Sequence, residues 1–130
     1  MMPVEKIASG GEISRLMLAL KYINIKNSSS KVLIFDEIDS GVSGQVASMM
    51  ADIMHEISQK NQLIAISHLP QVASKALNHL KVEKKIIDNQ TCSIIFELDS
   101  YQRVEEIAKL LSGKKITKSA IDNANDLLNQ

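Results

Sequence analysis

Two adjacent carboxylates at the end of an apolar run are the residues of this sequence best suited to chemistry. Residues 32–35, VLIF, lead directly into Asp36 and Glu37. A strand buried on both faces reads as a continuous apolar run, and ligands of α/β folds lie at the carboxyl ends of such strands. Carboxylates are costly to bury there unless a cation or a reacting group uses them. The run therefore indicates a site for Mg²⁺ and nucleotide, although a strand that ends in a solvated acidic turn would look the same.

A possible phosphate-binding site stands near the amino terminus. Ser9 and Glu12 have the S-x-x-E spacing of a capping box and enclose Gly10 and Gly11. Small residues at a helix N-terminus let an anion approach the backbone N–H groups, and the helix dipole favours its charge. The same four residues also suit an ordinary capped helix start. Arg15, one turn later, could point toward a phosphate, although a solvated salt bridge is the commoner role.

A histidine at the end of a second apolar strand completes the possible site. Residues 63–66, LIAI, predict that strand, and His68 follows it closely. A neutral imidazole at this position can hydrogen-bond a phosphate oxygen and orient a water molecule. A single histidine at a strand end is more often a polar edge residue, so the order of the surrounding motifs decides between the two interpretations. Between the acidic pair and this strand lies a tight turn that contains Ser40, Gly41, Ser43 and Gly44.

The elements that would position these residues alternate between helix and strand. The chain has 130 residues, 45% of them apolar and 23% charged, which is ordinary for a domain with a core of its own. Two buried strands with a helix between them predict a parallel βαβ core, to which a β-hairpin is appended. The expected helices span 9–26, 45–60, 70–77, 103–112 and 117–129, and the expected strands span 31–36, 63–66, 79–87 and 92–98.

Helical spacing of apolar residues predicts which side chains face the core. In the first helix these are Ile13, Leu16, Met17, Leu20 and Ile23. In the second they are Val46, Met49, Met50, Ile53, Met54 and Ile57. In the helix at 103–112 they are Val104, Ile107, Ala108 and Leu111.

Composition narrows the class of protein. Acidic and basic residues balance at 15 each, so no global positive charge indicates nucleic-acid binding. The single Cys92 excludes an intrachain disulfide and fits a reducing compartment. No apolar run is long enough to span a membrane, no signal peptide is visible, and no Cys/His cluster has zinc spacing. We therefore expect a soluble cytoplasmic protein with no membrane partner.

The order of these motifs resembles the head of ABC-type ATPases. Over residues 7–70 the pieces are similar to the signature motif, Walker B, D-loop and switch histidine, in that order. Within that superfamily, residues 6–21 (KIASGGEISRLMLALK), 35–44 (FDEIDSGVSG) and 66–73 (ISHLPQVA) resemble the bacterial RecN family. That family consists of SMC-like ATPases that act in DNA double-strand-break repair and recombination. The resemblance implies an α/β fold of the P-loop NTPase type, mainly a parallel sheet with flanking helices and an appended hairpin.

The resemblance also implies a role for each candidate residue, with ATP and Mg²⁺ as cofactors. Asp36 would bind Mg²⁺ through a water molecule, and Glu37 would orient or deprotonate the attacking water. His68 would contact the γ-phosphate as the second catalytic residue. Ser9, Gly10, Gly11 and Glu12 would bind nucleotide in trans, held by the opposing head. Ser40, Gly41, Ser43 and Gly44 would form the D-loop between the two heads.

One component of such a head is missing from the sequence. The phosphate-binding pattern G-x-x-x-x-G-K-[ST] has no match, and its nearest decoy at 112–115 lacks the required Gly and the final Ser or Thr. We therefore expect residues 1–130 to be a single domain, the C-terminal portion of a split head whose N-terminal half carries Walker A. The chain alone should be inactive and should expose apolar surfaces that this half covers. Its partners would be the N-terminal half, the second head of a homodimer and, through the full-length protein, DNA in the nucleoid.

Two other interpretations remain open. The chain could be a head fragment of another SMC or ABC-type ATPase, but the HLPQVA stretch and the SGVSG turn argue against it. It could also be a non-catalytic interaction module that keeps the fold and has lost the chemistry. The presence of both Glu37 and His68 argues against lost chemistry in the parent protein.

Overall fold

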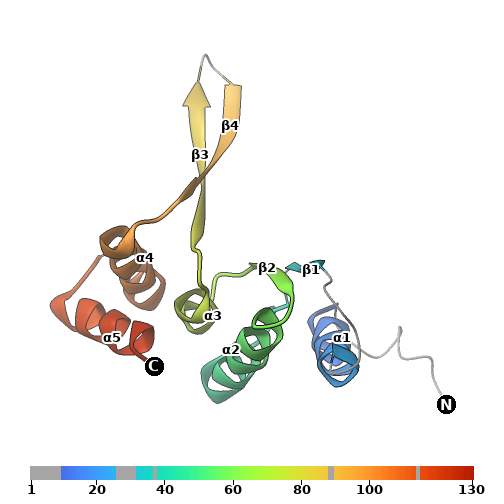
Figure 1. Cartoon of the computed structure of the whole chain (residues 1–130). Coiled ribbons are helices and arrows are strands. Elements are labelled where there is room, and N and C mark those ends of the chain that lie inside the picture. The colour runs from blue at the N-terminus through green and yellow to red at the C-terminus, as the bar shows by residue number, and fades with distance from the viewer. Residues whose placement is uncertain (1–9, 26–31, 37, 88–89, 114) are drawn as a thin grey trace. The chain divides into compact units, whose positions relative to one another are not determined.

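The computed structural model describes residues 10–36 with a gap at 26–31, and residues 38–130 with gaps at 88–89 and 114 (Figure 1). These residues form two compact units, a first unit that ends at Lys75 and a second unit that begins at Ala76. The first unit contains α1 (Gly10–Ile25), β1 (Val32–Asp36), α2 (Gly44–Ser58), β2 (Gln62–Ile66) and α3 (Pro70–Lys75). The second contains β3 (Leu80–Ile87), β4 (Gln90–Glu97), α4 (Ser100–Ser112) and α5 (Lys118–Leu128). No helix among the described residues has the length and hydropathy to cross a membrane.

A parallel strand pair is the centre of the first unit. β1 and β2 are parallel, with Val32 opposite Gln62 and Asp36 opposite Ile66, and α2 makes the connection between them. The predicted βαβ core is therefore confirmed. The core cluster of this unit consists of Leu18, Leu33, Phe35, Ile38, Val42, Ala47, Met50, Ala51, Met54, Ile57, Leu69 and Val72.

The two faces of this strand pair differ in burial. On β1, Leu33 is 5% exposed whereas the next residue, Ile34, is 66% exposed. On β2, Ile64 and Ile66 are exposed in the same way. The expectation that the strand is buried on both faces is wrong for this structure. Successive side chains of a strand point to opposite faces, and the described helices of the first unit cover one face only (Figure 1).

Helix α1 turns its apolar stripe away from the core. The five residues predicted to be buried, Ile13, Leu16, Met17, Leu20 and Ile23, are all exposed. Instead Leu18 is buried and Tyr22 packs against the core cluster. These two residues are four apart and therefore share one face of the helix. The stripe is apolar, but nothing in the described part of the chain covers it.

Helix α2 buries a face that is partly the predicted one. Met50, Met54 and Ile57 are buried as expected, whereas Val46 and Met49 are exposed. Two alanines on the helix, Ala47 and Ala51, are buried in their place. Since alanine side chains are small, this face allows a close approach to the neighbouring elements. Periodicity alone did not identify that face, because alanine contributes little to an apolar stripe.

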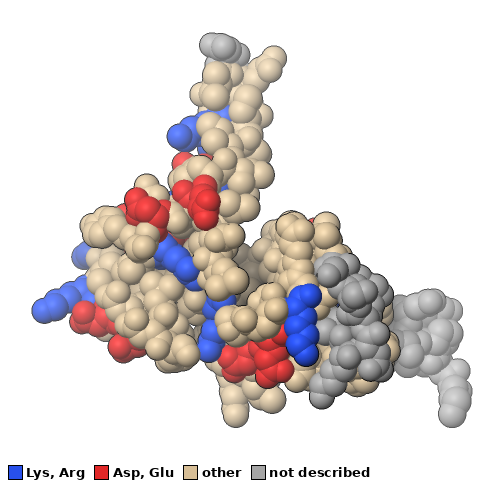
Figure 2. Space-filling view, viewed as in Figure 1, with Lys and Arg blue, Asp and Glu red and all other residues tan. Residues whose placement is uncertain are grey.

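The second unit pairs a hairpin with two helices. β3 and β4 are antiparallel, from Leu80 opposite Glu97 to Ile87 opposite Gln90, which confirms the predicted hairpin. One face of the hairpin carries exposed apolar side chains, and its surface in view is mostly uncharged (Figure 2). The exposed apolar side chains that share this face are Leu80, Val82, Ile86 and Ile95.

Helix α4 begins three residues before its predicted start because of a capping box. The Gln102 N–H donates to Asp99 Oδ1 at 2.8 Å, and the Asp99 N–H donates to Gln102 Oε1 at 3.1 Å. This D-x-x-Q pair satisfies two N–H groups that a helix start otherwise leaves unpaired. Ile107 and Ala108 are buried as predicted, but Leu111 is exposed.

We predict opposite outcomes for alanine at two neighbouring positions of β1. Leu33→Ala should lower the free energy of unfolding by about 2–5 kcal/mol, because it leaves a cavity in the core. Ile34→Ala should cost less than about 1 kcal/mol, because the removed atoms are already in solvent and only strand propensity changes. Urea unfolding of the 130-residue chain, followed by circular dichroism, measures both. Equal losses at the two positions would contradict the one-sided burial.

Candidate nucleotide-binding site

The carboxyl ends of β1 and β2 bring two of the predicted residues to one edge of the sheet. Asp36 is the last residue of β1 and lies opposite Ile66, the last residue of β2. His68 follows two residues later, and both Asp36 and His68 are exposed. Two further residues of the predicted site, Glu37 and Ser9, lie outside the described residues. The strand register therefore places Asp36 and His68 at neighbouring strand ends.

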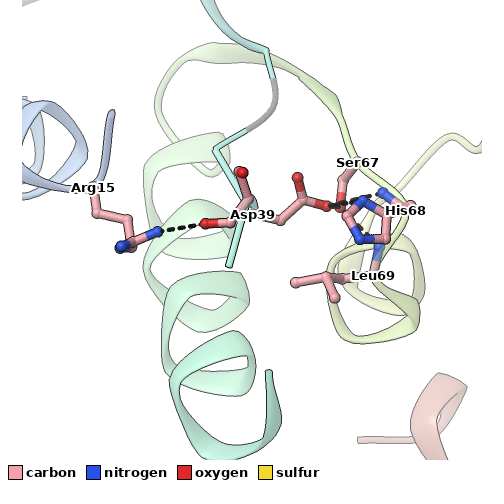
Figure 3. A network of polar contacts seen from close by, with 6 residues as sticks. Arg15, Asp39, Ser67, His68 and Leu69 are labelled. Carbon is pink, nitrogen blue, oxygen red and sulfur yellow. Dashed lines mark hydrogen bonds and ion pairs between the residues drawn. The ribbon is translucent and has the colours of Figure 1, made fainter. Parts of the chain in front are cut away.

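Asp39 is the polar centre of this edge, and sequence reasoning missed it. Its side chain is 2% exposed. The Ser67 hydroxyl donates to Asp39 Oδ2 at 2.6 Å, and the His68 backbone N–H donates to the same oxygen at 2.9 Å. His68 Nδ1 lies 3.0 Å from that oxygen as well (Figure 3). One buried carboxylate oxygen thus receives contacts from two consecutive residues that follow β2.

The ionisation of Asp39 reflects this environment. Burial by itself would raise the pKa of Asp39. The hydrogen bonds from Ser67 and from the His68 amide, together with the interaction with the His68 ring, outweigh burial and lower that pKa below its usual value. Asp39 is therefore a carboxylate at neutral pH and can only accept hydrogen bonds.

The same network continues into the start of α3. Besides donating to Asp39, the Ser67 oxygen accepts the Leu69 N–H at 3.0 Å. The Leu69 carbonyl then accepts from Val72 and Ala73, in the first turn of α3. The chain between β2 and α3 is therefore held by side-chain as well as backbone hydrogen bonds, and the His68 ring, whose side chain is 75% exposed, projects from a fixed segment.

The predicted D-loop lies exposed between two buried anchors. Ile38 and Val42 are buried, and the Val42 N–H donates to the Asp39 carbonyl at 3.0 Å. Gly41 and Gly44 have φ angles of 71° and 57°, in the left-handed region that glycine adopts without strain. The four residues predicted to form the D-loop are exposed: Ser40, Gly41, Ser43 and Gly44.

Arg15 connects the predicted signature helix to this turn. Its guanidinium donates to the Ser40 carbonyl at 2.9 Å, from α1 to the segment after β1 (Figure 3). The expectation of a solvated salt bridge is therefore wrong in its partner, because the acceptor is a backbone carbonyl. No sequence pattern singles out a carbonyl as the partner of an arginine, so only the packing of α1 beside the turn could identify it.

Helix α1 begins at Gly10, directly after the predicted cap Ser9, which lies outside the described residues. Gly10 and Gly11 open the helix, and Glu12 is an exposed acidic residue in its first turn. Backbone N–H groups in the first turn of a helix have no intrahelical acceptor and are available to an anion. Within the described residues, this helix start and the strand ends therefore form two separate polar features, joined by the Arg15 contact.

Mg²⁺ fits this site through a single protein carboxylate. Among the described residues, no group of three or more His, Cys, Asp or Glu side chains is placed to hold a metal. Mg²⁺ is commonly bound by one or two carboxylates together with substrate phosphates and waters. Asp36, exposed at the end of β1, suits that kind of site. The chemistry of its oxygen donor agrees with Mg²⁺, whereas a closed site built from protein ligands would need more of them.

The other two histidines, His55 and His79, lie outside the predicted site. His55 Nδ1 lies 3.1 Å from the Lys75 carbonyl oxygen and connects α2 to α3. His79 is half-buried, and burial lowers its pKa. Neither residue belongs to the edge formed by the strand ends, in agreement with their absence from the predicted site.

Curated proteins from several bacteria are similar to this sequence. The DNA repair protein RecN of Haemophilus influenzae is 40% identical over 126 residues, which are 97% of this chain and 23% of that protein. RecN of Halalkalibacterium halodurans is 44% identical over 126 residues, 97% of this chain and 22% of that protein. RecN of Bacillus subtilis is 40% identical over 127 residues, 98% of this chain and 22% of that protein. The chain thus spans less than a quarter of the length of these relatives.

A solved structure of the SMC ATPases has a similar fold. It comes from work on their ATP-driven dimerization and DNA-stimulated activation. The two chains superpose with a TM-score of 0.59 at 20% identity, over 85% of this chain and 66% of the other. The likeness confirms the predicted α/β fold class, since this chain has the fold of that SMC ATPase structure. No protein-family model matches the sequence.

We predict that Asp39 makes the stability of the chain depend on pH. A carboxyl group whose pKa is lowered on folding stabilises the native state above its unfolded pKa of about 3.9, and this contribution is lost as the pH falls through the folded pKa. Asp39→Asn should therefore lower the free energy of unfolding by roughly 1–2 kcal/mol at pH 7, and less in acid, as the wild-type carboxyl protonates.

Urea unfolding of wild type and variant at neutral and acidic pH measures this difference. Asp52→Asn is the matched control, since Asp52 is 59% exposed and pairs with Lys75 at the surface. The control should change stability little at either pH. A loss in Asp39→Asn that grows toward acid would contradict the sign of the prediction.

Proposed function

The chain belongs to the RecN family of DNA repair proteins, of whose members it spans one segment, and on that premise we propose that it is the C-terminal part of an ATPase head. The complete head would bind and hydrolyse ATP in DNA double-strand-break repair and recombination. One observation carries this proposal: the parallel register of β1 and β2 brings Asp36 and His68 to the same sheet edge. In open α/β sheets, that edge is where ligands bind.

Asp36, Glu37 and His68 would divide the chemistry of ATP hydrolysis. Asp36 would hold Mg²⁺ through a water molecule, and the ion, when bound, neutralises charge on the phosphates. Glu37 would orient or deprotonate the attacking water, since it directly follows Asp36. His68 would contact the γ-phosphate from the neighbouring strand end, with its exposed ring.

The start of α1 and the turn after β1 would serve a second head. We propose that the backbone N–H groups at Ser9, Gly10 and Gly11, together with Glu12, contact a nucleotide held by the opposing head of a homodimer. The helix N-terminus and its small residues support this assignment. The exposed turn with Ser40, Gly41, Ser43 and Gly44 would lie at the boundary between the heads as the D-loop. Since Arg15 donates to the Ser40 carbonyl, a movement of α1 would displace the turn after β1, and a movement of the turn would displace α1.

The N-terminal half of the head would cover the apolar surfaces that the first unit leaves exposed. The open face of the strand pair carries Val32, Ile34, Ile64 and Ile66, and α1 adds its outward stripe. Contiguous exposed apolar surface of this kind marks interaction sites. The RecN relatives are more than four times as long as the matched segment, so they contain the chain needed to cover it. DNA would be bound by the full-length protein in the nucleoid.

We predict that the chain alone hydrolyses ATP at background rate, because its sequence lacks the phosphate-binding loop. Mixing it with the N-terminal half expressed from the same gene should restore turnover. In the mixture, Glu37→Gln should reduce kcat by about 10²–10⁴-fold, the usual contribution of a general base. Phosphate release measures all three rates, and Glu105→Gln in α4 serves as the control.

Two results would contradict this assignment. Turnover by the chain alone that Glu37→Gln abolishes would show that the missing half is not needed. A folded mixture that fails to bind ATP would favour the non-catalytic interaction module instead.

We further predict that a charge on the open sheet face blocks assembly with the N-terminal half. Ile34→Lys should weaken the complex by at least about tenfold in Kd, because a lysine would have to be desolvated against an apolar partner. Isothermal titration calorimetry with the purified N-terminal half measures the affinity. Leu77→Lys, at another exposed apolar position, is the control. Equal affinities for Ile34→Lys and wild type would mean that the partner covers a different surface.

A further inference from the structure

We propose that Asp39 is a positioning residue that fixes the orientation and tautomer of the His68 ring. The inference rests on the proposed function only where it concerns ATP, since the contact between the two side chains stands by itself. Asp39 precedes the D-loop turn and His68 follows β2, so the residues are 29 positions apart and meet only through the fold. Asp39 lies within the matched segment 35–44, but the sequence assigned it no role, and its contact with His68 was not predicted.

The geometry holds His68 at two points. Its backbone N–H donates to Asp39 Oδ2 at 2.9 Å, and its Nδ1 lies 3.0 Å from the same oxygen. A residue bound through both main chain and side chain to one atom has little freedom to rotate its ring. The anchoring carboxylate is itself 2% exposed and receives the Ser67 hydroxyl at 2.6 Å. The ring is thus fixed on the buried side while three-quarters of the side chain remains exposed.

The carboxylate also decides which ring nitrogen carries the proton. A carboxylate is acceptor-only, so a hydrogen bond between it and Nδ1 requires a proton on Nδ1. The neutral ring then presents Nε2 to the ligand side as an acceptor. It can accept a hydrogen bond from a water molecule but cannot donate one to a phosphate oxygen. Donation to phosphate requires the doubly protonated ring, whose positive charge the Asp39 carboxylate offsets.

This result changes the role expected of His68. The sequence suggested a neutral imidazole that hydrogen-bonds a phosphate oxygen. With Asp39 on Nδ1, the neutral ring instead accepts from water, and the charged ring donates to phosphate. In either form the ring is held at Nδ1 and its side chain remains 75% exposed. An orienting carboxylate on the distal nitrogen is the arrangement that serine proteases use for their histidine.

The first test is the tautomer of His68 in the 130-residue chain, which needs no ATP. Ring ¹⁵N chemical shifts are measured by NMR at about pH 8.5, where histidine is normally neutral, and His68→Gln identifies the signals. We expect the proton on Nδ1 in the wild type. Asp39→Ala should shift it toward Nε2, because no carboxylate oxygen then accepts from Nδ1. Ser67→Ala, which removes a hydroxyl but leaves the carboxylate, should keep the wild-type tautomer.

Two outcomes of the NMR measurement overturn the inference. A proton on Nε2 in the wild type does so, even if no variant folds. An unchanged tautomer in folded Asp39→Ala does so as well.

The second test is a double-mutant cycle on ATP hydrolysis by the full-length protein. Asp39→Ala should lower kcat by about 10–100-fold, with KM for ATP changed less than about threefold. In a His68→Gln background the same change should have no further effect, because Asp39 acts through His68. Asp52→Asn, at an exposed aspartate, should leave kcat unchanged. Additive losses in the cycle overturn the inference, because Asp39 would then act by another route.

The two tests separate the inference from the function on which it partly rests. Full activity of His68→Gln would contradict the catalytic assignment of His68, and with it the part of the inference that concerns ATP. The NMR result would in that case still decide whether Asp39 sets the tautomer. Conversely, a strong loss in His68→Gln together with an unchanged tautomer in Asp39→Ala would leave the proposed function intact and reject the role of Asp39.

Discussion

A carboxylate that is 2% exposed must find hydrogen-bond donors inside the protein, and Asp39 finds them at the end of the neighbouring strand. Its oxygen takes the Ser67 hydroxyl, the His68 N–H and the His68 ring. Breaking this cluster would leave a buried charge unpaired. Separation of the turn after β1 from the segment after β2 therefore has a large free-energy cost. The position of the candidate nucleotide site depends on this constraint, since Asp36 and His68 stand on the two segments that Asp39 joins.

The second organising feature is apolar surface that the described residues leave uncovered. β1 has the composition of a strand buried on both faces, yet one face is open, and α1 carries an apolar stripe on its exposed side. Such surfaces are stable in water only if something else packs on them, because exposed apolar area raises the free energy of the isolated chain. In the proposed head, one segment outside this chain would supply both the phosphate-binding loop and the cover for these apolar surfaces.

Local patterns predicted the elements and much of the site. Apolar periodicity and turn residues located the helices and strands to within a few residues, and Asp36 and His68 lie at the strand ends that the structure places side by side. The misses have two physical origins. The D-x-x-Q cap at Asp99 is a local signal that moved α4 earlier, whereas the burial of α1 and the Arg15 contact depend on which surface packs against which.

The sequence by itself determined the order of the elements, the parallel character of the strand pair and the family to which the segment belongs, because these follow from residue types at short spacing. Only the tertiary structure decided which face of β1 and α1 is buried, and that Asp39 rather than a neighbouring acid holds His68. Periodicity indicates that a face is apolar, but whether it is covered depends on a partner surface elsewhere in the chain. Asp39 and His68 are 29 residues apart, and their contact exists because the register of two parallel strands brings the following segments together.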